Sequence, residues 1–282
     1  MSIDFLNSQT SKILAFSGSL CEHIAMPKNS DQFIQSFARG LSVIRCFGPN
    51  YREMTLTQIA ERTNLSRAGA RRILCTLKNL GYVGADGRHF SLTPRILDLG
   101  YSYLSSLPFW DFAQPIMENM VARVHETSSI SVLDGADIVY VVRVPTRRIL
   151  TTNISIGTRL PAYVQSMGRV LLGGLAAEEL DRYFATVELQ PFTRRTIVDP
   201  VGLRKIIADD RRKGWSWVNG ELEGGICGIA VPLMDSNGKI VAAMNIVTST
   251  GRSSKSRAIK TFLPELTRAV EQINSCLRVR GV

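Results

Sequence analysis

The segment from residue 55 to residue 92 constrains the fold of this chain more than any other. Thr55-Leu56-Thr57-Gln58 has the pattern of a capping box, which begins a helix that we expect to run through Arg62. Asn64 tolerates the left-handed backbone of a tight turn, and Ser66 is a favourable N-cap for a second, longer helix. The segment therefore predicts a helix-turn-helix.

The second helix has one apolar and one basic face. Its apolar residues recur at helical spacing and are Ala70, Ile73, Leu74, Leu77 and Leu80. After Gly81, two short apolar runs flank the turn Asp86-Gly87, a sequence typical of a β-hairpin. Arg88 lies at the tip of this predicted wing. A basic helix followed by a wing fits a major groove plus a contact with the DNA backbone.

The sign of the charges decides between two interpretations of this segment. Between Arg62 and Arg88 there are six basic residues and one acid, Asp86. The surface of an ordinary three-helix domain usually mixes signs, whereas phosphate contacts require a stripe of positive charge. We therefore predict that double-stranded operator DNA binds a set of polar and basic residues, which are Thr57, Ser66, Arg67, Arg71, Arg72, Thr76, Lys78 and Arg88.

Bulk properties limit the class of protein. A chain of 282 residues predicts about two domains, and a formal net charge of +10 favours a polyanionic partner. The five cysteines are scattered without a C-x-x-C pair, which is typical of a reducing cytoplasm. No apolar run is long enough to span a bilayer, and residues 1–28 lack the pattern of a signal peptide. We expect a cytoplasmic protein without a membrane partner, with residues 1–28 as a flexible tail.

Residues 29–93 are predicted to form the DNA-binding domain. Its first helix is expected from Asp31 to Phe47, where Gly48-Pro49 ends it. Apolar residues at helical spacing are expected to pack this helix on the other two, and they are Phe33, Ile34, Phe37, Leu41 and Ile44.

Residues 94–127 are predicted to form a helical linker. Pro94 favours the first position of one helix, and Asp111 with Gln114 is expected to cap a second helix that extends to about Glu126. The apolar stripe of this linker has two open interpretations. It is a dimerisation element, since DNA readers often bind two half-sites, or it packs on its own downstream domain.

Residues 128–282 predict strands, then helices, then strands again. The expected strands are 129–133, 138–144, 151–156, 215–218, 229–234 and 240–247. The expected helices are 165–172, 178–184, 200–213 and 254–277. This order indicates an α+β domain in which an antiparallel sheet carries helices on its faces.

The sequence gives little support for a catalytic function. The three histidines, His23, His89 and His125, fall in the tail, the wing and the linker, whereas a catalytic histidine lies beside a nucleophile or a carboxylate. No nucleophile elbow, phosphate-binding loop, dinucleotide fingerprint or metal-ligand cluster is present in the sequence. We expect no enzyme activity, no cofactor and no metal.

The second domain has instead the composition of a binding pocket. The loop from Gly157 to Arg169 enters a helix at about Ser166, and helix N-termini favour anions. Arginine can hold a carboxylate with two parallel hydrogen bonds, and four arginines lie near this loop in sequence, namely Arg143, Arg147, Arg148 and Arg159. Asn245, within an apolar strand, is either a satisfied structural amide or a ligand contact. Glu221 is expected to be solvated or bonded within its own loop.

The order of motifs across both domains resembles the IclR family of bacterial transcription regulators. The matching runs are Ala38 to Ile44, Leu56 to Thr63, Leu65-Ser66-Arg67, Leu80 to Val83, Leu160 to Tyr163, Ser166 to Arg169 and Glu221 to Pro232. Two runs, Tyr101 to Ser106 and Leu160 to Arg169, are most similar to the Pca- and Pob-type regulators of aromatic-acid catabolism, which act on the β-ketoadipate pathway.

This resemblance implies a winged helix-turn-helix, a linker that dimerises, and a GAF-like domain that binds a small effector. It implies a homodimer or a dimer of dimers that represses or activates transcription. Carried over to this sequence, the effector pocket comprises Ile149, Thr152, Leu160, Ser166, Gly228, Asn245 and Val247, and we add Arg148, Tyr163 and Met167 from the neighbouring motifs.

Two positions of the implied pocket depart from better-known members. Gly228 and Val247 stand where a cysteine and a serine can occur, so polar contacts for a very small acid are missing. An aromatic acid or its ring-cleavage product fits apolar walls better, with Arg148 as the expected carboxylate partner. Two other classes stay open: a metabolic enzyme with a nucleic-acid-binding domain, and a module whose basic face binds an acidic protein.

Overall fold

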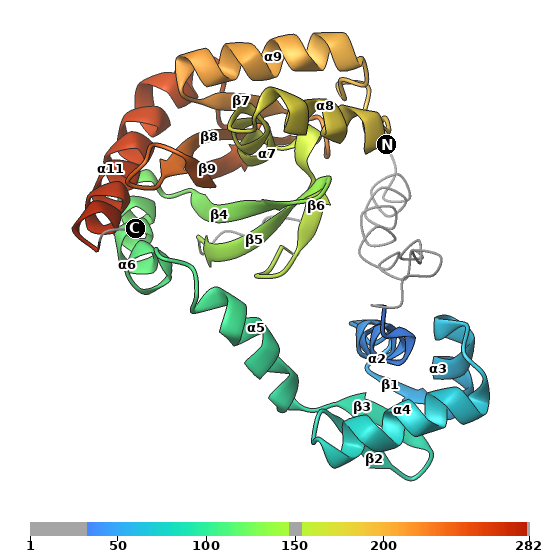
Figure 1. Cartoon of the computed structure of the whole chain (residues 1–282). Coiled ribbons are helices and arrows are strands. Elements are labelled where there is room, and N and C mark those ends of the chain that lie inside the picture. Colours follow the sequence, from blue (N-terminus) through green and yellow to red (C-terminus); the bar gives the residue numbers. More distant parts are fainter. Residues whose placement is uncertain (1–32, 147–153, 281–282) are drawn as a thin grey trace. The chain divides into compact units, whose positions relative to one another are not determined.

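The computed structural model describes residues 33–146 and 154–280 (Figure 1). The chain divides into two compact units between Tyr103 and Leu104. The predicted tail, residues 1–28, lies outside the described residues. Each unit is described by itself.

The first unit contains a small three-stranded sheet and three helices. Its elements are α2 (Gln35–Arg45), β1 (Glu53–Thr55), α3 (Leu56–Thr63), α4 (Arg67–Asn79), β2 (Val83–Asp86) and β3 (His89–Leu92). The antiparallel sheet has the order β1-β3-β2, so the predicted hairpin is present and β1 pairs with its second strand, β3, which lies in the centre of the sheet. Val43, Met54, Ile59, Leu74 and Val83 are the centre of the core.

Local capping fixes the ends of α3 and α4 as predicted. The Thr55 hydroxyl accepts from the backbone N–H of Gln58, and the Gln58 side chain accepts from the backbone N–H of Thr55 at 2.8 Å. Asn64 has a φ of 53° in the turn. The Ser66 hydroxyl caps α4 by accepting from the backbone N–H of Gly69 at 3.1 Å. At the far end Gly81 has a φ of 82°, which allows the chain to leave the helix for the wing.

The first helix packs differently from the expectation. Of the predicted core face, Ile34, Phe37 and Leu41 are exposed, Phe37 to 67%. The contact with α3 and α4 uses Val43 and Cys46 at the other end of the helix, with Ile44 packed beside them. Helical spacing identifies an apolar stripe but not the surface that covers it. α2 has apolar residues on two sides, and the buried side is the one with Val43 and Cys46.

The linker region divides between the two units. A short 3-10 turn, η1 (Pro94–Ile96), leads into α5 (Leu97–Leu104), and α6 (Trp110–Val124) follows. The predicted cap by Asp111 and Gln114 is wrong, because Asp111 is already inside the helix and Gln114 donates to Glu118 one turn later. The apolar stripe of α6 packs on the sheet of the second unit. The second interpretation of the linker therefore holds for this helix.

The second unit is built on a six-stranded antiparallel sheet (Figure 1). Its strands are β4 (Thr127–Asp134), β5 (Asp137–Val144), β6 (Arg159–Pro161), β7 (Ser216–Asn219), β8 (Ile226–Met234) and β9 (Ile240–Ser249), in the order β6-β5-β4-β9-β8-β7. The predicted α+β class is confirmed. The predicted strand at 151–156 is not, because residues 154–156 are irregular and β6 forms the edge; residues 151–153 lie outside the described part.

Helices cover both faces of this sheet. Their bounds are η2 (Ala162–Val164), α7 (Ser166–Gly173), α8 (Ala177–Thr186), α9 (Pro200–Lys213), α10 (Lys255–Arg257), η3 (Ala258–Phe262) and α11 (Leu263–Val279). α6 and α11 pack on one face, and α7, with α8 and α9 outside it, packs on the other (Figure 1). None of the helices in the described ranges is both long enough and apolar enough to cross a membrane.

A β-bulge in β5 changes which side chains share a face. Ile130 of β4 pairs with Val142, but the next residue, Ser131, pairs with Tyr140, so Val141 is an extra residue. Val141 and Val142 both pack toward α6 and α11. The alternation restarts after them, and Arg143 therefore lies on the same face of the sheet as Tyr140, which is the face covered by α7.

Candidate nucleic-acid interface and effector cavity

The residues predicted to contact DNA lie at the surface of the first unit. All eight are exposed, and α4 carries five of them. Arg67, Arg71, Arg72, Lys78 and Arg88 form no ion pair with any residue in the described ranges, so their charges are uncompensated. A surface of unpaired cations on a helix and its wing can neutralise phosphates.

Two members of the motif have other roles than expected. Arg62 is half-buried and its guanidinium lies 3.6 Å from the centre of the Tyr51 ring, so it packs within the unit instead of extending the basic stripe. Leu80, predicted for the core, is 52% exposed because it is the C-cap residue, where the chain leaves the helix.

A cavity opens in the second unit between the sheet and the N-terminal end of α7. It encloses about 670 Å³ of empty space, its open mouth included. Five of the predicted pocket residues line it, and these are Leu160, Ser166, Gly228, Asn245 and Val247. Arg148, Ile149 and Thr152 lie outside the described residues.

Tyr163 and Met167 do not line this cavity. The Tyr163 hydroxyl donates to the backbone carbonyl of Gln190 and accepts from its N–H, both at 2.8 Å. Met167 is fully buried, and its sulfur accepts a hydrogen bond from the Ser131 hydroxyl. Both side chains belong to the buried apolar cluster that also contains Leu160 and Val164, two residues that line the cavity.

Arg143 is the cation that the structure brings to the cavity. Its Nη1 donates to the Ser129 hydroxyl of β4 at 3.2 Å, and no carboxylate in the described part of the chain pairs with it. Partial burial lowers the pKa of the guanidinium from its ordinary value. A partly desolvated arginine with only a neutral partner can accept an anionic ligand.

Tyr140 lies beside Arg143 on the cavity wall. Its ring is buried, and burial raises the pKa of its phenol to about 12, so the hydroxyl is neutral near pH 7. It can donate a hydrogen bond to a carboxylate next to the guanidinium. By contrast Arg159, also noted in the sequence, pairs with Asp134 at 2.6 Å and lies off the cavity.

The opposite wall is the N-terminal end of α7. Gln165 and Ser166 line the cavity, and no side chain caps this helix end, which favours negative charge. Close packing of this end needs Gly168, because a Cβ there would lie 2.0 Å from the carbonyl oxygen of Ala162. The Oδ1 of Asn245 accepts from the backbone N–H of Ser129 at 3.1 Å, as expected of a structural amide, and the residue also lines the cavity.

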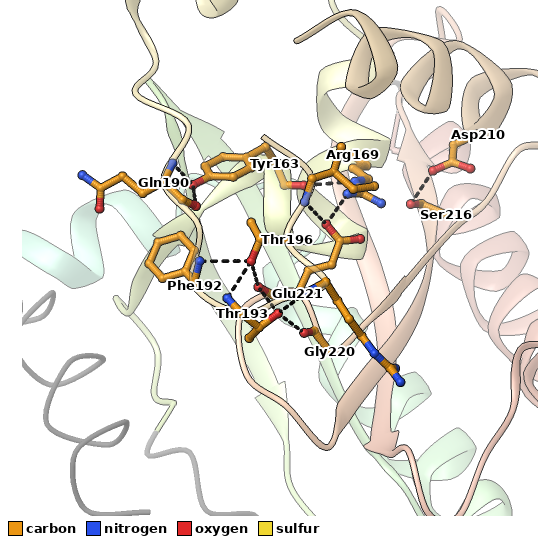
Figure 2. Close-up of polar contacts among 12 residues, drawn as sticks. Tyr163, Arg169, Gln190, Phe192, Thr193, Thr196, Asp210, Ser216, Gly220 and Glu221 are labelled. Carbon is orange, nitrogen blue, oxygen red and sulfur yellow. Dashed lines mark hydrogen bonds and ion pairs between the residues drawn. The ribbon is translucent and has the colours of Figure 1, made fainter. Parts of the chain in front are cut away.

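Glu221 lines the cavity and belongs to a buried ion pair. Figure 2 shows Arg169 of α7 donating to Glu221 at 2.6 Å, with side chains only 2% and 7% exposed. Arg169 also donates to the backbone carbonyl of Tyr163 at 3.0 Å. The expectation that Glu221 is solvated or bonded within its own loop is wrong. Burial raises the pKa of this carboxyl, and the guanidinium of Arg169 opposes that shift.

Threonine side chains fasten the loop around Glu221. Thr196 donates to the backbone carbonyl of Glu221, and Thr193 donates to that of Gly220, each at 2.6 Å (Figure 2). The segment before α9 is therefore tied to the loop that holds Glu221. Glu221 is therefore held by Arg169 at its carboxylate and by Thr196 at its backbone carbonyl.

The arrangement is suited to binding and not to covalent chemistry. Among the described residues no group of His, Cys, Asp or Glu could hold a metal ion. Cys227 lines the cavity, but burial raises the pKa of its thiol to about 11, which disfavours the reactive thiolate.

Sequence reasoning missed Ser129, Tyr140 and Arg169 as site residues and noted Arg143 only as a neighbour of the loop. Regular alternation along β5 would place Val142, instead of Arg143, on the face of Tyr140. The bulge carries no residue signature in this sequence. The face of β5 that lines the cavity could therefore not be identified from the sequence alone.

A winged helix-turn-helix followed by a sheet domain with a cavity that contains an arginine is the architecture of a ligand-responsive DNA-binding regulator. Two family models match the chain: the IclR helix-turn-helix domain over residues 36–87, and the bacterial transcriptional regulator IclR C-terminal domain over residues 101–275. This protein belongs to the IclR family of bacterial transcriptional regulators, which are not enzymes.

Its relatives include regulators of aromatic-acid catabolism. The chain is 42% identical to the Pca regulon regulatory protein of Pseudomonas putida over 84% of this chain and 82% of that protein. It is 33% identical to the p-hydroxybenzoate hydroxylase transcriptional activator of Acinetobacter baylyi over 90% and 97% of the two chains.

Solved structures agree with this family. A transcriptional regulator from Rhodococcus sp. RHA1 is 48% identical, with a TM-score of 0.79 over 88% of this chain and 99% of that one. The inducer-binding domain of the Acinetobacter PobR transcription factor, a double mutant in complex with 3-hydroxybenzoic acid, is 29% identical, with a TM-score of 0.55 over 57% and 95%.

Proposed function

We propose that this protein controls genes of aromatic-acid catabolism in response to a carboxylate bound in the cavity beside Arg143. The observation that carries the proposal is Arg143, which lines the cavity and whose only described hydrogen-bond partner is the neutral Ser129 hydroxyl. The relatives named after the Pca regulon and p-hydroxybenzoate hydroxylase support an aromatic acid or a β-ketoadipate-pathway product as the effector. The cytoplasm, where operator DNA is accessible, is the expected compartment.

In the proposed complex Arg143 holds the effector carboxylate. The neutral Tyr140 hydroxyl donates to the same group, and the uncapped end of α7 contributes its partial positive charge. Apolar side chains such as Leu160 and Val247 contact the carbon skeleton. Arg148, which lies outside the described residues, stays a predicted carboxylate partner. A dicarboxylate needs two cationic partners, whereas a hydroxybenzoate needs one.

Calorimetry with 4-hydroxybenzoate, protocatechuate and β-ketoadipate tests the effector. Replacing a charge-assisted hydrogen bond costs about 1.5–3 kcal/mol, so Arg143→Met should weaken binding roughly 10- to 150-fold. Arg159→Met is the matched control, because that arginine pairs with Asp134 away from the cavity. Equal affinities for the two variants would refute the assignment of Arg143. No heat with any of the three acids would remove the aromatic pathway while leaving the family intact.

Operator binding is proposed to use the exposed face of α4 and the wing. The affinity for DNA taken from upstream of the gene should fall steeply with salt, at a slope near −0.9 for each phosphate contacted. Arg71→Ala should reduce that slope by about 1 if the residue contacts a phosphate, and should relax specificity if it contacts a base. Arg204→Ala, whose arginine pairs with Asp181 in the second unit, is the control. A slope that is independent of salt would contradict phosphate contact.

We also propose that the regulator is a homodimer, or a dimer of dimers, through α5. This helix exposes Leu97, Leu99, Tyr101 and Tyr103. Four exposed large apolar residues on one short helix favour a partner surface. Sedimentation analysis of Tyr101→Glu should show dissociation toward the monomer; an unchanged sedimentation coefficient would place the interface elsewhere.

A further inference from the structure

The effector cavity and α6 lie on opposite faces of the same sheet. Met117 and Met120 of α6 belong to the core cluster that contains Val141 and Val142, whereas the cavity lies on the face covered by α7 (Figure 1). An effector beside Arg143 is therefore separated from α6 by the strands. α6 is the first helix of the second unit and follows α5 in the chain. An influence of the effector on α6 passes through the strands or around their ends.

The chain turns from α6 into the sheet at His125 and Glu126. α6 ends at Val124, and β4 begins at Thr127. His125 has a φ of 55°, a left-handed conformation that is uncommon for a residue other than glycine. Thr127 pairs with Val247, which lines the cavity. The corner between the helix and the sheet therefore lies next to the cavity wall.

Arg252 holds Glu126 at this corner. Its Nη2 donates to the Glu126 carboxylate at 3.1 Å. The side chain of Glu126 is 7% exposed, whereas that of Arg252 is 40% exposed. A carboxylate that is buried to this extent is unfavourable without a cation or hydrogen-bond donors beside it. The ion pair therefore stabilises the residue that joins α6 to β4.

The turn that carries Arg252 is tied to strands of the cavity wall. The backbone N–H of Arg252 donates to the carbonyl of Ser249 at 3.0 Å, and Ser249 pairs with Ile226, which lines the cavity. The Cys227 thiol, which also belongs to a cavity-lining residue, donates to the backbone carbonyl of Ser253 at 3.9 Å. A ligand that moves this wall therefore moves the turn and its guanidinium.

The charges of the pair also act on the cavity. Burial is the main cause that raises the pKa of Cys227, the charge of Glu126 raises this pKa further, and that of Arg252 lowers it. Both charges therefore lie near the wall. An anionic effector is repelled by Glu126 and attracted by Arg252, so its affinity depends on how the two side chains are placed. A ligand can shift an equilibrium between two placements only through such a difference.

We infer that the Glu126–Arg252 pair is a regulatory contact, which links occupancy of the cavity to the end of α6 and thereby to operator affinity. The identity of the effector rests on the proposed function. Linkage requires that effector and operator change each other's affinity by the same factor. The contribution of the pair can therefore be measured from the operator side as well as from the effector side.

Hydrogen exchange of the full-length protein tests the contact from the operator side, without an effector. Saturation with duplex DNA taken from upstream of the gene should change the exchange rates of backbone amides in residues 226–228 and 249–253 by about threefold or more in the wild type. Arg252→Met should bind the DNA and lose this change. Arg252→Lys keeps the cation and should respond like the wild type. Unchanged exchange in the DNA-bound wild type would overturn the inference.

Arg123→Met is the matched control. Arg123 lies in the last turn of the same helix, but it pairs with Glu265 of α11 at 2.7 Å and not with a residue of the cavity strands. This variant should retain the exchange response of the wild type. An equal loss in Arg123→Met and Arg252→Met would show that any ion pair of α6 has this effect, and the specific role of Arg252 would be refuted.

Operator titrations with and without 4-hydroxybenzoate, protocatechuate or β-ketoadipate measure the same link from the effector side. The effector should change the operator affinity of the wild type by about 5- to 150-fold, and that of Arg252→Met by less than about threefold. Calorimetry should show that Arg252→Met still binds the effector. A full response in Arg252→Met would overturn the inference. Failure of all three acids to bind would count against the proposed function, and the exchange experiment would still decide on the contact.

Discussion

Removing Arg169 should be among the most destabilising single changes in the second unit. Arg169→Met abolishes its 2.6 Å contact with Glu221 and its hydrogen bond to the carbonyl of Tyr163, and it leaves a carboxylate at a site that is 7% exposed. Breaking a buried pair from one side costs about 3–5 kcal/mol. A domain of this size loses roughly 2–4 °C of melting temperature per kcal/mol, so the expected decrease is about 6–20 °C.

The exposed pair Arg212–Asp209 is the matched control. Its nitrogen and oxygen are also 2.6 Å apart, but the arginine side chain is 77% exposed. Arg212→Met should therefore cost less than about 1 kcal/mol. The double variant Arg169→Met/Glu221→Met should be more stable than Arg169→Met alone, because no charge is left unpaired. Equal losses for Arg169→Met and Arg212→Met in chemical denaturation would refute the reasoning from burial.

The free energy of unfolding that Arg169→Met loses should also depend on pH. Burial raises the pKa of Glu221 in the folded protein and Arg169 opposes that shift, so the variant should raise this pKa further. Between the ordinary carboxyl pKa and the raised folded value, the folded variant holds a proton that the unfolded chain has released. Its free energy of unfolding then falls as pH rises through that window. Arg169→Met should be closer to wild type at pH 5 than at pH 8, and the opposite order would contradict the assigned cause.

Three further changes test the cavity walls. Gly168→Ala places a Cβ against the backbone carbonyl of Ala162, so we expect several degrees of lost melting temperature, measured by thermal unfolding. Gly228→Ala brings a Cβ to 3.2 Å from the Ser166 hydroxyl and narrows the cavity, so calorimetry should show weaker effector binding with little change in stability. Tyr140→Phe should weaken binding about fivefold or more, and wild-type affinity should not depend on ionisation of this phenol between pH 6 and 9 because its pKa is about 12.

The elements predicted well from the sequence are those whose ends are fixed locally. α9 runs from Pro200 to Lys213 as expected, because Asp199 accepts from two backbone N–H groups at one end and Gly214 adopts a φ of 76° at the other. The turn and caps of the helix-turn-helix are of the same kind. Such signals lie within four residues of the structure that they determine, so they can be recognised without knowledge of the fold.

The elements that were missed depend on distant partners. β1 has three residues and exists because Met54 pairs with Phe90 of the wing. Glu221 is buried because Arg169, 52 positions away, meets it. A single sequence contains both residues of each pair but no information that joins them. Family resemblance named five of the residues that line the cavity but did not identify Arg143 as its cation.

The bulge at Val141 makes the ligand class of this cavity sensitive to the register of one strand. If the strand kept Val141 but paired regularly beyond Ser131, Arg143 would turn toward the apolar layer under α6 and α11, and Val142 would take its place on the cavity wall. A register shift of one residue, with no substitution, would thus convert an anion site into an apolar one and bury a charge in the core. Related regulators could change effectors by this route only if the buried layer changed with it.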